Sequence, residues 1–457
     1  MQQPKAMTTE AFLRREVFRQ PISRSMGREA ITQAGADDKI DMTPDNILKY
    51  QRTDFATPKG IVFGVMELFR NDEGQITRCN TIFNHKKKVL EYAYDNKGRL
   101  AAVKTDGVLS EQYQYGSRGE RLWELNGTRY VFNYLSQLEQ VRSLKGNITF
   151  VYDDRGRVVQ KRGGSRVTTF GYNTYGFLER ICLPDSRCIT YTYDPLGRRS
   201  SKLVNGNVTE KYCWKDMLCL QAACTGDDKN HVVFNYEESE KNRLQPASLS
   251  CNGKEYFLAY NHVGTLLAIA DEAGSVVHIE ETDSFGRRLS HNKFATVAMI
   301  SFGGGQLDDD TGLVHFLFRD YDPATGFFIQ QDPLGRHGGD ADVYGYCLDD
   351  PVNLVDPLGL KGGGIDASYL KKRAGGLGRG FDDAISFFDK FTPTTPLVNL
   401  IEEAFDRDLD QDGDASRLSR FSDFMSSKNV KNYSSYSQLL RDSFKILGPN
   451  GDSLRGR

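Results

Sequence analysis

The chain has 457 residues, a formal net charge of −2 and a mean hydropathy of −0.52. This length gives room for two or three domains, and the near-neutral charge excludes a general field that attracts nucleic acid or an acidic membrane. No run approaches the ~20 apolar residues of a membrane span. Because residues 1–20 lack a hydrophobic signal core, we expect any export to use a dedicated machine.

Residues 1–55 form a charged, irregular N-terminal extension to which the sequence assigns no function. From about residue 60 the chain becomes periodic, with a tyrosine followed by Asp-x-x-Gly and often by Arg. Clear copies begin at Tyr94, Tyr152 and Tyr193. The tyrosines that we assign to successive copies are at 94, 115, 134, 152, 172 and 193, which gives gaps of 21, 19, 18, 20 and 21 residues. Weaker copies continue to Tyr260.

Each copy has the pattern of two short strands and two turns. Alternation such as Ile189-Thr-Tyr-Thr-Tyr193 places both tyrosines on one face of a sheet, and Asp-x-x-Gly makes a tight turn. Two strands and two turns use about 20 residues. A single hairpin cannot bury its own face, so successive hairpins must lie side by side. The sequence therefore predicts a mainly β protein with a long, curled antiparallel sheet.

These copies of Tyr-Asp-x-x-Gly-Arg resemble the YD repeats of the Rhs and teneurin-like proteins, from about residue 70 to 360. The resemblance implies a YD-repeat β-shell over residues 56–260 that winds into a hollow container. The alternative that the residues leave open is a β-solenoid or a propeller with a coincidental tyrosine motif.

The stretch 319–360 is dense in aspartate, proline, glycine and tyrosine. It contains four Asp-Pro pairs, at 322–323, 332–333, 350–351 and 356–357. Asp initiates a turn, Pro fixes φ and a following Gly takes a positive φ, so this stretch predicts several turns with carboxylates close together.

Residues 261–360 resemble the Rhs-associated core domain, and the ending Asp356-Pro-Leu-Gly-Leu360 resembles its processing signature. Bacterial Rhs proteins and Tc-toxin C components with this signature cut themselves after the last Leu. The resemblance implies that Asp332 and Asp356 are catalytic, that Arg319 supports them, and that the scissile bond is Leu360–Lys361. Asp322 and Asp350 are then turn-formers only.

Paired carboxylates suit this chemistry. Two carboxyl groups held close share a proton, so one can accept a proton from water while the other donates to the leaving amine. The alternative is that Asp332 and Asp356 are themselves only turn-formers. Two positions depart from the family pattern. Arg336, after Asp332-Pro-Leu-Gly335, stands where the family usually has a hydrophobic residue, and Phe327 replaces the more usual arginine after Gly326.

The composition changes at residue 361, and residues 361–457 contain no His, Cys or Trp. A Gly-rich stretch to Gly380 predicts a linker, because no GKS or GKT follows it as in a phosphate loop. Apolar residues at helical spacing then predict a small all-α domain. The resemblance places the variable toxin domain here, but the residues match no toxin family. The lack of His and Cys excludes His-dependent nucleases, papain-like proteases and the usual zinc deaminases.

One segment of this domain has the opening of a calcium loop. The candidate ligands are Asp408, Asp410, Asp412 and Asp414. The twelfth position is Ser419 rather than Glu, so an acidic, solvated loop is the alternative. We expect no other cofactor or metal.

The eight cysteines contain no CxxC pair. Cys182 and Cys188 flank a turn and face each other if that turn closes a hairpin. In a chain without a signal peptide, we expect reduced, half-buried thiols.

Together these features predict an Rhs-type toxin or effector. Its shell encloses residues 361–457 as cargo, and self-cleavage after Leu360 releases them. We expect synthesis in a bacterial cytoplasm and export by a specialised secretion system. Expected partners are an immunity protein, a chaperone or the export apparatus, and a second copy if the short shell does not close alone. The alternatives are a structural or adhesive YD-repeat protein without cleavage or toxin, and an inactive fragment.

Overall fold

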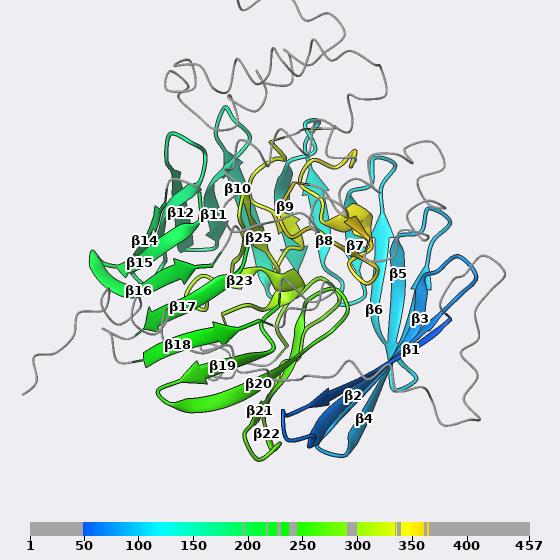
Figure 1. Ribbon diagram of the computed structural model, residues 1–457. Helices are drawn as coiled ribbons and strands as arrows, with labels where there is room; N and C mark the ends of the chain where they lie inside the picture. Colours follow the sequence, from blue (N-terminus) through cyan, green and yellow to red (C-terminus); the bar gives the residue numbers. More distant parts are fainter. Residues whose placement is uncertain are drawn as a thin grey trace, which may run out of the picture.

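A computed structural model describes residues 49–194, 197–215, 218–225, 230–236, 245–289, 299–333, 335, 340–360 and 363–364 (Figure 1). The strands of the large sheet are β1 (Tyr50–Ala56), β2 (Val62–Arg70), β3 (Ile76–Phe83), β4 (Lys86–Tyr94), β5 (Leu100–Thr105), β6 (Val108–Tyr115), β7 (Arg121–Glu124), β8 (Arg129–Phe132), β9 (Leu138–Ser143), β10 (Gly146–Tyr152), β11 (Val158–Gly163), β12 (Arg166–Tyr172), β13 (Leu178–Cys182), β14 (Cys188–Tyr193), β15 (Arg199–Val204), β16 (Asn207–Trp214), β17 (Leu220–Thr225), β18 (Asn230–Asn235), β19 (Ser248–Cys251), β20 (Lys254–Tyr260), β21 (Leu266–Asp271) and β22 (Val276–Ile279). The remaining elements are η1 (Phe302–Gly304), β23 (Gln306–Leu307), β24 (Val314–Phe316), β25 (Arg319–Asp322), β26 (Phe327–Phe328), η3 (Cys347–Asp349), β27 (Leu354–Val355) and β28 (Gly363–Gly364).

The first 22 strands form one antiparallel sheet in which each strand pairs with the next along the chain. Tight turns with positive φ at both central residues enforce this order. Asp106 and Gly107 have φ of 50° and 82°, and Asn205 and Gly206 have φ of 50° and 84°. Turns of this kind match the twist of the strands they join. The predicted mainly β architecture is confirmed. The helices among the described residues are single turns of 3₁₀ helix.

The repeated motif fixes successive strands by one set of contacts. The side chain of Asp153 accepts hydrogen bonds from the backbone of Arg155 and Arg157, and its second oxygen pairs with the Arg157 guanidinium. That guanidinium lies over the ring of Tyr172, 4.6 Å from its centroid. The Tyr172 hydroxyl in turn donates to the carbonyl oxygen of Val158, 2.7 Å away. This copy of the motif therefore closes its own turn and holds the tyrosine of the next.

The same hydroxyl-to-carbonyl bond recurs along the sheet, at Tyr94 to Ile76, Tyr115 to Leu100, Tyr152 to Leu138, Tyr193 to Leu178 and Tyr236 to Leu220. The sequence assignment was wrong in one copy. Phe132, not Tyr134, occupies the tyrosine position, since Phe132 pairs with Leu138 as Tyr152 pairs with Val158. Tyr134 lies in the turn and is 86% exposed. Phe132 has no hydroxyl, so this copy lacks that hydrogen bond.

The large sheet curls around residues 299–360, which lie in its concave side (Figure 1). Phe327, Ile329 and Tyr344 of this segment share an apolar cluster with the sheet residues Leu178, Ile181 and Tyr191. The chain's own core segment therefore packs against the concave face of the curled sheet, inside the container that the resemblance implies.

The two ends of the large sheet also meet. Phe63 and Phe83 of β2 and β3 pack in one cluster with Phe257 and Ala268 of β20 and β21, and Figure 1 shows β2 and β4 beside β21 and β22. The turn at Gly274 abuts Ile61. Side chains of the same chain thus join the ends of the curled sheet.

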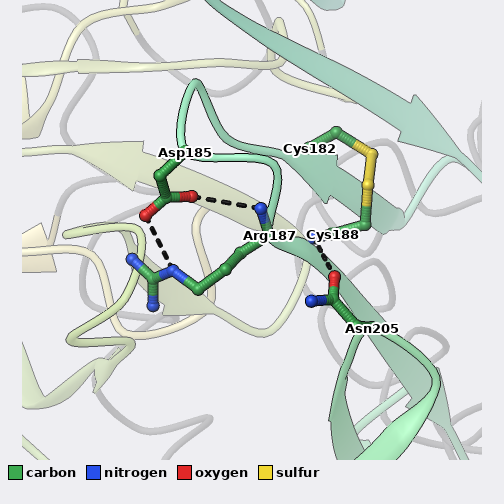
Figure 2. Close-up of a disulfide and its surroundings, with 5 residues drawn as sticks. All are labelled: Cys182, Asp185, Arg187, Cys188 and Asn205. Carbon is green, nitrogen blue, oxygen red and sulfur yellow. Dashed lines mark hydrogen bonds and ion pairs between the residues drawn. A yellow bond between two sulfur atoms is a disulfide. The ribbon is translucent and has the colours of Figure 1, made fainter.

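Cys182 and Cys188 are directly opposite on β13 and β14 and form a disulfide (Figure 2). The hairpin geometry expected for them is confirmed, and the expected reduced state of this pair is not what the structure contains. Cross-strand neighbours have Cβ atoms close enough to be bridged. The other six cysteines, including Cys224 and Cys347, form no disulfide in the part of the chain that the structure describes.

Two expectations lie outside the described residues: the all-α domain and the calcium loop at Asp408–Asp414. Among the described residues, no helix is long and apolar enough to cross a membrane.

Candidate self-cleavage site

Arg319 begins strand β25 of the small four-stranded sheet, β23-β24-β25-β26. Its side chain is 3% exposed, so its positive charge needs nearby carboxylates. The ring of Phe328, on the neighbouring strand β26, lies 3.7 Å from the guanidinium carbon. This stacking restricts the planar guanidinium to one orientation.

The guanidinium joins the two aspartates that the sequence singled out. Its Nη2 lies 3.2 Å from Asp332 Oδ2 and 3.1 Å from Asp356 Oδ2. These carboxylates are 7% and 2% exposed. Because both oxygens contact one nitrogen, the two carboxyl groups lie close together. Folding thus brings residues 24 positions apart in the chain into one cluster.

Arg319 and Asp356 also hold the backbone that precedes the predicted scissile bond. Arg319 Nε donates to the carbonyl oxygen of Gly359. Asp356 Oδ1 accepts from the backbone N–H of Leu360 at 2.9 Å. If the predicted cleavage follows Leu360, these two bonds hold the chain on the amino side of the bond that is cut. Lys361 lies outside the described residues.

The turn of residues 356–359 makes this grip close. Gly359 has a φ of +68°, and its N–H bonds to the Asp356 carbonyl oxygen at 3.2 Å. A Cβ at Gly359 would lie 2.7 Å from the carbonyl oxygen of Phe316 and 3.2 Å from Arg319 Cβ. Only glycine fits both the backbone angle and this approach. The Gly of the signature therefore has a physical reason.

Neighbouring backbone bonds fix the rest of the site. Arg319 Nη1 donates to the Val343 carbonyl oxygen at 3.2 Å, and Asp332 N donates to the same oxygen at 2.8 Å. Phe318 N donates to the Leu358 carbonyl oxygen at 3.1 Å. The strand that carries Arg319 is thereby attached to the segment it would cut.

Asp322 and Asp350 have the turn-forming contacts that were expected of them. Asp322 Oδ1 accepts from Ala324 N, and its Oδ2 pairs with Lys161 at 2.6 Å. Asp350 Oδ1 accepts from the side chain of Asn353 at 2.9 Å. Of the two departures from the family pattern, Phe327 packs edge-on against Tyr130 and Phe132, and Arg336 lies outside the described residues.

Sequence reasoning missed several buried groups around the site. Burial, with the charge of Asp356, raises the pKa of the Cys347 thiol well above its usual range. Burial and the neighbouring Asp340 raise the pKa of Asp342 to about 7. No local sequence pattern identifies either residue, because the burial and the charged neighbours that shift their pKa values arise only on folding. Over the described residues, no group of three or more His, Cys, Asp or Glu side chains is placed to hold a metal ion.

Comparison with known proteins agrees with this architecture. The model of the teneurin YD-shell family matches residues 31–342. The chain belongs to that family. Curated relatives include the tRNA3(Ser)-specific nuclease WapA of Bacillus spizizenii, 29% identical over 59% of this chain and 11% of the relative. The Double-stranded DNA deaminase toxin A of Burkholderia cenocepacia is 30% identical over 59% of this chain and 21% of its own length. Toxin protein Tse5 of Pseudomonas aeruginosa is 24% identical over 59% and 25%.

The YD-shell chain thus spans between about a tenth and a quarter of the length of these relatives.

Proposed function

We propose that this YD-shell protein is an Rhs-type toxin precursor that cuts itself once, after Leu360, through Asp332 and Asp356. The observation that carries the proposal is the double role of Arg319 and Asp356. Arg319 is the cation that contacts the carboxylate pair, and Asp356 is one of the two carboxylates. Each also binds the backbone before the predicted scissile bond: Arg319 binds the carbonyl of Gly359, and Asp356 binds the N–H of Leu360. Turn-forming alone does not require a buried arginine between two carboxylates.

The reaction is a hydrolysis. One carboxylate removes a proton from water as the oxygen attacks the Leu360 carbonyl carbon, and the other carboxyl group gives a proton to the Lys361 nitrogen as the C–N bond breaks. The products are a Leu360 carboxylate and a Lys361 amine. Arg319 holds both acidic groups and the backbone in place, so the scissile bond is presented without a diffusional encounter.

Residues 361–457 are the proposed effector. The relatives named above are toxins or nucleases, which supports a toxin role for a YD-shell chain with a distinct C-terminal segment. We assign residues 1–55 to an N-terminal extension, 56–260 to the shell, 261–360 to the core and 361–457 to the effector. The proposal also includes synthesis in a bacterial cytoplasm and export by a specialised machine. Its partner is an immunity protein or a chaperone.

A denaturing gel of the purified chain tests the cleavage. We expect two fragments, 1–360 and 361–457, for the wild type, and one intact chain for Asp332→Asn and for Asp356→Asn. Asp322→Asn is the matched control, because Asp322 also precedes a proline in this segment but only forms a turn and an ion pair. It should still be cut. A wild type that stays full-length sinks the proposal and favours a structural or adhesive protein.

Toxicity separates the effector from an inert tail. Residues 361–457 expressed alone should slow growth of the host, whereas the Asp356→Asn full-length chain should not. Enclosure by the shell is tested by limited proteolysis of the cleaved complex. Persistence of fragment 361–457 in the native complex, with rapid digestion after mild denaturation, supports enclosure. Equal digestion in both conditions contradicts it.

A further inference from the structure

A second polar site lies on the other side of strand β25 from the cleavage residues. Arg319 and Asp320 are consecutive on this strand, so their side chains leave opposite faces of the small sheet. Asp320 pairs with His315 across the β24–β25 ladder, and its Oδ1 lies 3.0 Å from His315 Nδ1. The inference below does not rest on the cleavage reaction.

The hydrogen bonds of Asp320 fix the state of His315. Asp320 also accepts from Arg199 Nη2 at 2.8 Å and from Gln330 Nε2 at 2.9 Å. A carboxylate with these partners accepts and does not donate, so His315 Nδ1 carries the hydrogen that it shares with Asp320. Burial and the charge of Arg199 lower the pKa of His315 against the opposing effect of Asp320, which favours the neutral ring. In the neutral ring with a hydrogen on Nδ1, Nε2 is an acceptor.

His315 Nε2 is buried and has no hydrogen-bond partner among the described residues. Gln306 stands directly opposite His315 in the β23–β24 ladder, and its Oε1 is also buried without a partner. The two residues are 4% exposed each. Directly opposed side chains lie on one face, with Cβ atoms about 5 Å apart. Two unsatisfied acceptors therefore face one space, which costs stability unless a donor fills it.

That space is a pocket between the large sheet and the core segment. His315 and Gln306 line it together with apolar walls from Trp214, Leu218, Ile300, Leu317 and Pro357. The pocket is small, with room for a group of about two or three water-sized atoms, and it is partly open to solvent.

The other polar groups in the wall are already used. The N–H groups of Gly303, Gly304 and Gly305 donate to Thr265, Gly264 and Phe302. Trp214 Nε1 donates to the Arg199 carbonyl oxygen. Arg198 of the wall is paired with Asp194, and Arg199, next to it in the chain, is paired with Asp320. Because these charges are balanced one to one, a charged ligand would lose its hydration without gaining a counter-ion.

We propose that this pocket binds a primary carboxamide, whose two N–H groups donate to His315 Nε2 and Gln306 Oε1. A carboxamide is small enough for this space, and its neutrality matches the balanced charges. Its carbonyl oxygen keeps its hydration at the open side of the pocket, and the carbon attached to it lies against the apolar walls. The source is either an asparagine or glutamine side chain of a peptide or a free small amide.

Propionamide is the probe for the chemistry. In a titration of the full chain labelled with ¹⁵N-histidine, the His315 Nε2 resonance should shift saturably, with a dissociation constant in the millimolar range. N,N-dimethylpropionamide, which lacks both donors, should produce no shift at the same concentrations. Gln306→Leu should weaken propionamide binding at least tenfold while the His262 resonance, from a site 2.6 Å from the Val352 carbonyl oxygen, stays unchanged and reports an intact core.

An acetylated Gly-Gly-Gln-Gly-Gly peptide, with its Glu counterpart as control, distinguishes the sources. Tighter binding of the Gln peptide than of propionamide assigns the pocket to a side chain, and weaker binding assigns it to a free amide. The proposal is overturned if propionamide gives no shift, if the dimethyl compound binds equally, or if Gln306→Leu binds as the wild type does. A pocket that retains only ordered water in these titrations gives the first of these results.

Discussion

The large sheet and the core segment satisfy their polar groups over very different distances along the chain. In a repeat, Asp153 bonds to residues two and four positions away, and Tyr172 reaches a strand 14 positions away. In the core, Asp320 pairs with Arg199, 121 positions away, and Asp308 with Lys202, 106 positions away. Repeats therefore close as local units, whereas the core needs the whole sheet to be in place before its charges are paired.

This difference predicts that ion pairs of similar geometry in the core and in a repeat contribute unequally to the free energy of unfolding. Arg199→Met removes the partner of Asp320 in a pair whose side chains are each 1% exposed, and should destabilise the chain by about 3–5 kcal/mol. Arg99→Met breaks the Arg99–Asp95 pair of a repeat, with side chains 12% and 23% exposed, and should cost about 1 kcal/mol or less. Urea unfolding of both variants measures the two costs. Equal losses would show that the core is no more interdependent than a repeat.

The cleavage site should depend on the shape of Arg319 as well as its charge. One guanidinium contacts both carboxylates and two backbone carbonyl oxygens. Arg319→Lys keeps the charge but cannot make these contacts together, so cleavage should slow at least about a hundredfold, or ~2.7 kcal/mol. The rate is followed on gels after refolding from denaturant. Arg118→Lys, at a half-exposed repeat turn, is the control and should leave the rate unchanged.

Acid should weaken the join between sheet and core at His262. Its Nε2 donates to the Val352 carbonyl oxygen at 2.6 Å, and burial lowers its pKa to about 4. The unfolded chain takes up this proton near pH 6.5, so its contribution to stability is complete above that pH and is lost as pH falls toward 4. The loss should be about 3 kcal/mol by pH 4.

His262→Gln keeps a donor but does not titrate, which makes it the comparison. The free energy of unfolding of the wild type minus that of the variant should fall as pH is lowered from 7 to 4. The other titrating groups cancel in this difference. A difference that is constant with pH would contradict the assignment.

A single hydroxyl of the tyrosine ladder should have the smallest effect. Tyr172→Phe removes the bond to the Val158 carbonyl oxygen and should cost about 1 kcal/mol. Tyr175→Phe, in the adjacent turn and 55% exposed, should cost nothing measurable. The copy with Phe132 already lacks this hydroxyl, so Phe132→Tyr should be neutral or stabilising in the same thermal unfolding assay.

The sequence by itself determined the repeated strands, the turns and the candidate residues Arg319, Asp332 and Asp356. Period, turn chemistry and the signature at residues 356–360 are local, and local patterns can be read directly. The position of Tyr134 shows the limit of such reading: a tyrosine near the expected spacing was assigned, but the strand register gives its place to Phe132.

Only the tertiary structure decided what fills the curled sheet, how its ends meet and where the pairs His315–Asp320 and Arg199–Asp320 form. These contacts join residues that no period relates, and each forms because burial forces a polar group to find a partner. The same reason explains Arg319. The sequence identified Arg319 as a candidate residue. Its bond to Gly359, and the bond of Asp356 to Leu360, form only because the core folds back on its own last turn.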